Sequence, residues 1–229
     1  MPLSRRRALA CACLAPFAGA RAQGHHGPRS TLTPQAALER LMQGNARFVA
    51  DAPQPAPPRT ERRRMLVAGQ QPFAAILGCS DSRAVPEIVF EADLGEIFTV
   101  RVAGNALANA ELGTLEYASA ALGVPLILVL GHQGCGAVSA AVEVAERGAT
   151  LPYALATLIN AILPSVAEAR RGNPVNLVDA AVRIHARRTA QLIAGGASPG
   201  IRERVQAGEI MVRAAYYDLS EGRVALLDA

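Results

Sequence analysis

This 229-residue sequence has few long apolar runs and only a small excess of one charge. It contains four cysteines and no lysine. Beyond residue 22, no segment stays apolar and uncharged over the roughly 20 residues that a membrane-spanning helix needs, so we predict no membrane span. Arginine supplies all 23 strongly basic residues, four of them before residue 23, and residues 23–229 balance 19 basic against 19 acidic side chains. That balance, together with a basic run at 62–64 typical of a solvated helix face, gives no footprint for nucleic acid.

The first 22 residues have the pattern of an export signal. A basic start at Arg5–Arg7 precedes a short apolar stretch at 8–20, and a small-x-small cleavage site ends at Ala22. The run that begins at Ser4 resembles a twin-arginine signal, although a Sec signal also begins with positive charge. We therefore predict a signal peptide over 1–22 and a periplasmic or secreted protein.

Residues 23–229 have the length of one compact domain. Its N-terminal part, 31–60, predicts a helical arm, because Thr33 is placed to cap a helix whose first position is Pro34. The proline-rich "DAPQPAPPRT" that follows this helix predicts an extended arm or a loop.

From residue 71 onward, short apolar runs alternate with helical stretches. The runs "PFAAILG", "IFTVRVA" and "PLILVLG" have the length of strands, and helices are predicted over 111–123, 136–148, 155–170 and 175–194. Continuous apolar strands that alternate with helices indicate an α/β fold, with a mostly parallel central sheet and helices on both faces. Two further strand-like runs around Ser220–Gly222 predict a C-terminal edge hairpin.

Two of the predicted strands end in sequences rich in reactive side chains, "GCSDSR" and "GHQGCG". The carboxyl ends of parallel strands meet at one edge of a sheet, so we expect Cys79, His132 and Cys135 to converge. Two thiolates and one imidazole form the ligand set that holds zinc with one position left open, as in catalytic sites. A zinc-storage or structural module is the alternative, and it would need a fourth ligand that the sequence does not readily supply.

The other histidines and the local glycines have simpler interpretations. His25 and His26 lie in the lead-in that precedes the first helix, and His185 lies in mid-helix, where we expect a surface or helix-packing role. Three glycines flank the His132-x-x-Cys135 motif, and we expect them to permit its tight backbone: Gly131, Gly134 and Gly136.

Only Cys79 and Cys135 remain after residue 22. In an exported protein, two cysteines are commonly one disulfide, so a structural disulfide and a thiol redox pair are both alternatives to a metal site. Redox catalysts usually place their cysteines close together in sequence, whereas 55 residues separate these two. The redox alternative also leaves His132 without a role.

Asp81 and Arg83 follow Cys79 at alternate positions. In an extended segment these three side chains point to the same side, which places the carboxylate beside the metal. There it would coordinate the metal or accept a hydrogen bond from the water that the metal holds, and the arginine can hold it with two parallel hydrogen bonds. An ordinary surface ion pair is the alternative.

These residues resemble the beta-class carbonic anhydrases, and the resemblance covers most of residues 23–229. The stretches that carry it are "LMQGNARFV", "GCSDSRAVPEIVFEADLGEIFTVRVAGN", "GTLEYASAALGVPLILVLGHQGCGAV" and "AAYYDLSEG". The resemblance implies one zinc ion per subunit, held by Cys79, His132 and Cys135, with Asp81 and Arg83 as catalytic residues. It also implies a homodimer or higher homo-oligomer in which the N-terminal helix packs on the partner subunit.

The reaction that the resemblance implies is the reversible hydration of carbon dioxide to bicarbonate and a proton, through a zinc-bound hydroxide. The resemblance also implies a substrate pocket, partly supplied by the neighbouring subunit, and its residues are Gln70, Phe98, Ala103, Tyr117 and Gly136. Relatives on the same fold that hydrolyse carbon disulfide or carbonyl sulfide leave the substrate open. A non-catalytic zinc-binding module is the remaining alternative.

One branch of this family has a second bicarbonate site that closes the enzyme, and that site relies on a tryptophan three residues before the first zinc cysteine. Here the position is Ile76, and the sequence contains no tryptophan, although Arg101 matches an arginine of that site. We therefore expect an enzyme that rests open, with water on zinc and Asp81 bonded to Arg83.

Overall fold

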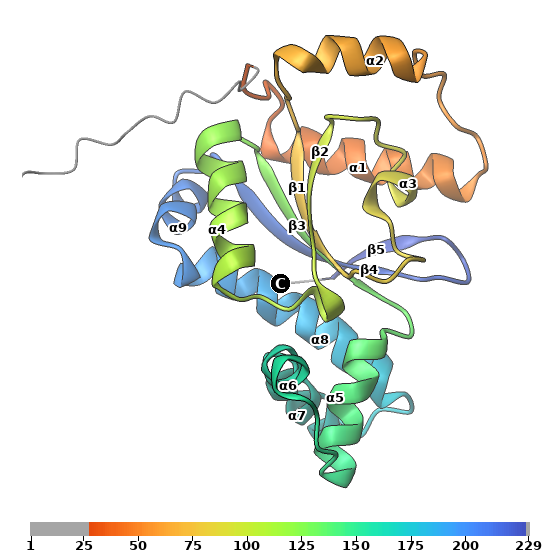
Figure 1. The fold of residues 1–229 in the computed structure, drawn as a ribbon, viewed down its shortest axis with the longest axis vertical. Coiled ribbons are helices and arrows are strands. Elements are labelled where there is room, and N and C mark those ends of the chain that lie inside the picture. The colour runs from red at the N-terminus through yellow and green to blue at the C-terminus, as the bar shows by residue number, and fades with distance from the viewer. Residues whose placement is uncertain (1–27, 228–229) are drawn as a thin grey trace, which may run out of the picture.

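The computed structural model describes residues 28–227, so the predicted signal peptide lies outside the described residues. Five strands form one sheet in the order β2-β1-β3-β4-β5 (Figure 1). The first four run parallel, and β5 pairs with β4 in the antiparallel direction, which confirms the predicted sheet and edge hairpin. The strands are β1 (Ala74–Gly78), β2 (Ile97–Arg101), β3 (Leu126–His132), β4 (Met211–Tyr217) and β5 (Val224–Leu227).

Side chains of the sheet alternate between two cores, one on each face. In β1, Ala75 and Leu77 belong to one core, while Ala74 and Ile76 belong to the other. Every residue of β1 and β3 is buried, because helices cover both faces of the sheet. The first core is covered by α4 (Asn109–Tyr117), α5 (Gly136–Arg147), α6 (Tyr153–Asn160), α7 (Leu163–Arg171), α8 (Leu177–Leu192) and α9 (Pro199–Gln206), and the second by α1 (Pro34–Val49) and α3 (Pro86–Val89).

Helix α1 begins as the sequence predicts. The side chain of Thr33 accepts a hydrogen bond from the Ala36 N–H at 3.2 Å, and Pro34 occupies the first helical position. Gly44 lies against the backbone of Phe90, where an added Cβ would come within 1.9 Å of the carbonyl oxygen. The absence of a side chain at Gly44 therefore sets how closely α1 approaches the end of α3.

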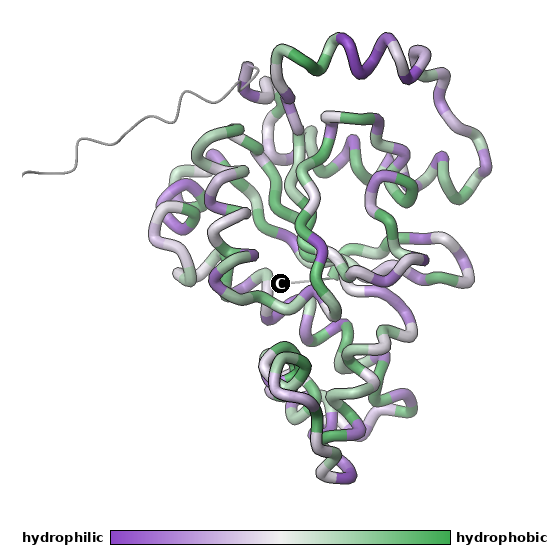
Figure 2. Tube along the Cα trace, in the orientation of Figure 1, coloured by the Kyte–Doolittle hydropathy of each residue, from purple (hydrophilic) through white to green (hydrophobic). Residues whose placement is uncertain are grey.

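The segment after α1 contains a helix that the sequence does not predict. Residues 51–58 contain neither helix nor strand, which fits the expected loop, but α2 (Arg59–Met65) and the 3-10 helix η1 (Leu66–Ala68) follow them. Helix α2 buries none of its residues, and Figure 2 colours much of it as hydrophilic. It is held by the Arg62 side chain, which donates a hydrogen bond to the Leu94 carbonyl at 2.9 Å.

The helices of the C-terminal half are more divided than the sequence indicates. The stretch predicted as 155–170 is split into α6 and α7, with Pro164 in the first turn of α7. Helix α9 is unpredicted; the Ser198 side chain caps it by accepting a hydrogen bond from the Ile201 N–H at 3.2 Å. Within residues 28–227, no helix combines the length and the apolar character needed to cross a membrane.

Candidate metal centre

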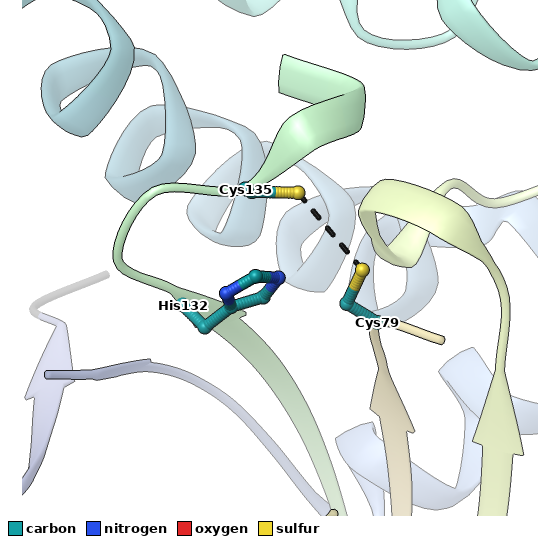
Figure 3. A group of neighbouring side chains, drawn as sticks. All are labelled: Cys79, His132 and Cys135. Carbon is teal, nitrogen blue, oxygen red and sulfur yellow. Dashed lines mark hydrogen bonds between the residues drawn. The ribbon is translucent and has the colours of Figure 1, made fainter. Parts of the chain in front are cut away.

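The metal-ligand candidates lie at the carboxyl ends of two neighbouring strands. β1 pairs with β3 so that Gly78 lies opposite Leu130, which places Cys79 and His132 at the same edge of the sheet. The chain then turns at Gln133 and Gly134 and returns with Cys135 just before α5. Figure 3 shows the imidazole ring and the two sulfurs pointing toward one another. The convergence predicted from the strand ends is therefore present.

The spacing of the three ligand atoms fits a metal ion. They lie within 4.8 Å of one another, and all three residues are buried. The sulfurs of Cys79 and Cys135 are 3.9 Å apart. Two sulfurs on a tetrahedral zinc ion are separated by about 3.8 Å, whereas a disulfide bond is about 2.05 Å long. Both cysteines are free thiols, so the structure carries the zinc spacing and not the disulfide.

His132 presents a nitrogen with an unused lone pair to the two sulfurs. Its Nδ1 lies 3.0 Å from the carbonyl oxygen of Gln133, an arrangement in which Nδ1–H donates the hydrogen bond. Nε2 is buried and meets hydrogen-bond geometry with no atom of residues 28–227. A backbone acceptor on one nitrogen fixes the tautomer that leaves the other nitrogen free to bind a metal.

The two sulfurs are close enough for one hydrogen bond between Cys79 and Cys135. The hydrogen bond from Cys135 is the largest of the interactions that lower the pKa of Cys79 to about 4, against the opposing effect of burial. The same hydrogen bond raises the pKa of Cys135. Backbone N–H groups of Gly104 and Asp81 point at the Cys79 sulfur from 3.2 and 3.4 Å. Two buried cysteine sulfurs and a free imidazole nitrogen form a donor set that suits zinc.

Asp81 and Arg83 form a bidentate pair beside this donor set. Arg83 Nε donates to Oδ1 of Asp81 at 2.9 Å, and Nη2 donates to Oδ2 at 2.7 Å. This hydrogen bonding holds the pKa of Asp81 well below its usual range, so the carboxylate stays ionised. Oδ2 lies 3.9 Å from Nε2 of His132, and Arg83 also reaches the Gly134 carbonyl at 3.5 Å. The pair therefore lies at the carboxyl edge of the sheet, beside the three candidate metal ligands.

The local geometry of this pair differs from the prediction. Residues 79–83 are not extended; the Asp81 carboxylate also accepts a hydrogen bond from the Arg83 N–H at 2.9 Å, and the chain turns at Ser82. Arg101, at the end of β2, donates to the carbonyls of Cys79 and Asp81 at 2.9 and 2.7 Å. The turn, held by Arg101, brings Asp81 beside His132. No local sequence pattern indicates this role of Arg101.

The three glycines of the second motif have different roles, which corrects the prediction. Gly134 alone has a left-handed conformation, with φ +62°, and forms the turn. Gly131 instead admits α8, since an added Cβ would lie 2.8 Å from Cγ1 of Val182. Gly136 has neither constraint and provides the first N–H of α5.

Of the predicted pocket residues, Ala103 and Gly136 lie near the metal ligands, because Ala103 adjoins Gly104 and Gly136 follows Cys135. The other three lie elsewhere in the same chain. Phe98 is opposite Ala75, four residues and so about 13 Å along the strand before Cys79. Tyr117 is 41% exposed and has its ring 6.0 Å from that of Phe98. Gln70 precedes the amino end of β1, at the opposite end of that strand from Cys79.

His185 has the helix-packing role expected for it. The residue is buried in α8, and its Nδ1 is 3.2 Å from the hydroxyl of Ser165 in α7. Burial lowers the pKa of His185 to about 4, so the ring is neutral near pH 7. Among residues 28–227, His185 belongs to no group of three or more candidate metal ligands.

The fold and the site together define a class, an α/β protein with two cysteines and one histidine that could hold a metal ion at the carboxyl edge of its sheet. The family model for carbonic anhydrase matches residues 74–224. The chain therefore belongs to the carbonic anhydrase family, in its beta class, and the prediction of this enzyme activity class is confirmed.

Curated relatives and solved structures agree with this membership. Carbonic anhydrase 2 of Mycobacterium tuberculosis is 41% identical over 196 residues, which cover 85% of this chain and 93% of the relative. The carbonic anhydrase of Pseudomonas aeruginosa is 32% identical over 201 residues, 82% of this chain and 86% of the relative. The solved beta-carbonic anhydrase CcaA is 25% identical, with a TM-score of 0.64, and the match covers 83% of this chain and 95% of that one.

Proposed function

We propose that this protein catalyses the reversible hydration of carbon dioxide to bicarbonate and a proton, with one zinc ion held by Cys79, His132 and Cys135. One observation carries the proposal. The unpaired Nε2 of His132 and two sulfurs 3.9 Å apart converge beside a carboxylate that Arg83 holds in a bidentate pair. A closed structural site has no use for that oriented carboxylate, whereas a site that activates water does.

Zinc in this position would lower the pKa of a bound water from 15.7 towards about 7 and so supply a nucleophile at neutral pH. Asp81 would accept a hydrogen bond from that nucleophile and thereby orient it toward the carbon of carbon dioxide. Arg83 keeps Asp81 ionised and fixes its direction, because two parallel hydrogen bonds leave the carboxylate no freedom to rotate. The N–H of Gly136, first in α5, would favour the anionic product.

We propose that the enzyme rests with Asp81 off the metal. Both oxygens of Asp81 are engaged by Arg83, and Arg101, which matches part of the regulatory bicarbonate site, is occupied by two backbone carbonyls. Ile76 stands where that site needs a tryptophan, and it is completely buried in the sheet. A chain built in this way has little to gain from moving Asp81 onto the metal.

The active form is proposed to be a homodimer or larger homo-oligomer. Gln70, Phe98 and Tyr117 lie away from the metal ligands of their own chain, and the half-exposed Tyr117 suits a wall presented to another copy. The solved enzymes of Sordaria macrospora, 22% identical with a TM-score of 0.65, are described as tetrameric beta-carbonic anhydrases. In this proposal the second copy completes the substrate pocket.

Export to the periplasm, by the twin-arginine route, remains a proposal from the sequence. Zinc loaded in the cytoplasm would protect both thiols from oxidation after export, since that route carries folded proteins. Changing Arg5 and Arg6 to lysine is expected to block delivery, measured by fractionation. Unchanged delivery would favour the Sec route.

The proposal is tested by stopped-flow hydration of carbon dioxide together with metal analysis, comparing the parent protein with Cys135→Ala. The parent is expected to hold one zinc ion per chain and to accelerate hydration, and the variant to do neither. A parent that holds zinc without accelerating hydration would point to a storage module. A parent that hydrolyses carbonyl sulfide but leaves carbon dioxide unchanged would contradict the substrate assignment.

A further inference from the structure

The turn that joins β4 to β5 lies between helix α1 and the metal ligands. We call residues 218–223 the hairpin turn and residues 132–135 the metal loop. Within the turn, the Asp218 carboxylate accepts hydrogen bonds from the N–H groups of Ser220 and Glu221 at 2.8 and 3.0 Å, and the Asp218 N–H donates to the Arg223 carbonyl at 2.9 Å. The hairpin turn is thus held in shape by its own hydrogen bonds. A shift of α1 against one side of the turn would therefore also shift the metal loop on its other side.

Gln133 connects the metal loop to the hairpin turn. Its side-chain Oε1 accepts hydrogen bonds from the N–H groups of Leu219 and Ser220, at 3.1 and 3.3 Å, and its own N–H donates to the Tyr217 carbonyl at 2.9 Å. Its carbonyl oxygen is the group that Nδ1 of His132 meets at 3.0 Å. Gln133 therefore binds the hairpin turn through its side chain and its N–H, while its carbonyl oxygen orients the imidazole ring of His132.

Asn45 of α1 connects the other side of the turn. It is only 3% exposed, and its amide is used at both ends. Nδ2 donates to the carbonyls of Val89 and Gly222 at 3.1 and 2.9 Å, and Oδ1 accepts from the Val224 N–H at 2.8 Å. Gly222 has φ +68°, and an added Cβ would lie 3.2 Å from the Phe48 ring of α1. The turn is therefore fitted closely against this helix.

We propose that Gln133 and Asn45 are positioning residues for the metal centre. They form one chain of contacts that runs from α1 through the hairpin turn to the ring of His132. The orientation of the imidazole, and with it the retention of zinc, depends on the docking of α1 against the turn. This inference rests on the zinc centre proposed above but not on the identity of the substrate.

The first test measures how fast zinc passes from the loaded full-length protein to a chromophoric chelator. Gln133→Met keeps the length of the side chain but loses the acceptor, and zinc release is expected to be about 10-fold faster, in the range found for groups that orient a metal ligand. Gln133→Glu keeps acceptor oxygens and is expected to release zinc more slowly than Gln133→Met. Ser198→Ala, which removes the cap of α9, is the control for a general loss of stability and is expected to release zinc at the parent rate.

A second readout separates a change of ligand geometry from a loss of stability. The visible absorption of cobalt-substituted protein reports the ligand field, and its bands are expected to shift in Gln133→Met but not in Ser198→Ala. Unchanged bands together with parent-like zinc release in Gln133→Met would overturn the role of Gln133. A parent protein that holds neither zinc nor cobalt would overturn the inference and the zinc centre together. If the parent does hold zinc, a Gln133→Met variant with parent-like zinc release and cobalt bands would overturn the inference alone.

The link through the turn is tested by combining Gln133→Met with Asn45→Ala and measuring zinc release from both single variants and the double variant. Because the contacts are in series, the double variant is expected to be no faster than the faster single variant. If Asn45→Ala does not fold, Gly222→Ala takes its place, since the added methyl would lie 3.2 Å from the Phe48 ring and would strain a residue with φ +68°. Rate increases that multiply in the double variant, or a parent-like rate in Asn45→Ala or its replacement, would overturn the link to α1.

Discussion

The surroundings of His132 and of His185 invite comparison, because the two rings look alike in isolation. Their residues are 0% and 3% exposed, each ring uses Nδ1 in a hydrogen-bond contact, and each has an Nε2 that meets hydrogen-bond geometry with no atom of residues 28–227. Burial and an unpaired nitrogen therefore do not identify a metal ligand. The difference lies in what faces that nitrogen.

His132 stands at the end of a strand, where two sulfurs and a carboxylate from separate segments converge on its ring. His185 stands in the middle of α8, packed against α7 through Ser165. Both rings are buried, but only at the strand end does a ring nitrogen face other candidate ligands. The topology of a parallel sheet brings those ligands together.

Removal of His132 is the sharpest way to break the comparison. His132→Ala is expected to lose zinc and to lower the hydration rate on the order of a thousandfold or more, because the metal-activated water is lost. His185→Gln, the matched change at the other ring, is expected to keep one zinc ion per chain. Metal analysis and stopped-flow hydration measure both variants, and zinc loss in His185→Gln alone would reverse the assignment.

The acid stability of the protein is expected to depend on His185. Its pKa is about 4 in the folded protein and 6.5 in the ordinary case, so the unfolded chain takes up the proton first. The free energy of unfolding is therefore highest above about pH 6.5. It falls by about 3 kcal/mol as the pH is lowered towards 4, because the unfolded chain binds the proton that the folded ring does not.

Chemical denaturation of the parent and of His185→Gln, with excess zinc in both, measures this contribution. Protonation of the zinc ligands affects both proteins equally, so the difference in unfolding free energy isolates His185. The variant is expected to lose less stability between pH 7 and 4. Parallel pH profiles would show that the ring of His185 is not kept neutral by burial.

Asp81→Asn tests whether the carboxylate belongs to the reaction or only to the surface. The amide cannot accept two charge-assisted hydrogen bonds from Arg83, so we expect a 10- to 100-fold slower hydration, roughly the range for groups that orient a metal site. Zinc content is expected to stay at the parent level. The matched control is Glu168→Gln, which removes an exposed ion pair with Arg188 and is expected to leave the rate unchanged. Equal rates in all three proteins would make Asp81–Arg83 a surface pair.

Ser165→Ala is expected to have the smallest effect. The change removes the hydroxyl that meets Nδ1 of His185 and leaves a buried ring nitrogen unpaired, which costs about 1–3 kcal/mol of stability. Thermal unfolding measures this loss, and the zinc content and the hydration rate are expected not to change. A fall in zinc content would mean that the two histidine regions are coupled.

The positions of the three candidate metal ligands could be predicted because they depend on little more than the order of the elements. Apolar runs identified β1 and β3, and parallel strands share an edge, so the residues that follow them had to meet. The hairpin was predictable from the turn residues between two apolar runs. The sequence does not predict helices α2 and α9, for two different reasons. Helix α2 buries none of its residues and so has no apolar period, and α9 follows a glycine-rich segment.

The finer geometry depended on contacts between distant segments. The turn at Asp81 is held by Arg101, twenty residues further along the chain, and the ring of His132 is held through Gln133 by a hairpin near the C-terminus. Neither contact leaves a periodic or spaced pattern in the sequence. The pocket residues Gln70 and Phe98 could be named only by resemblance, because they lie away from the candidate metal ligands of their own chain.

X-ray absorption at the zinc edge of the purified, zinc-loaded protein tests the metal centre most directly. The account predicts two sulfurs at about 2.3 Å and one imidazole nitrogen at about 2.0–2.1 Å, with a light atom completing four ligands. A protein that retains no zinc, or one whose Cys79 and Cys135 are joined in a disulfide, would contradict it.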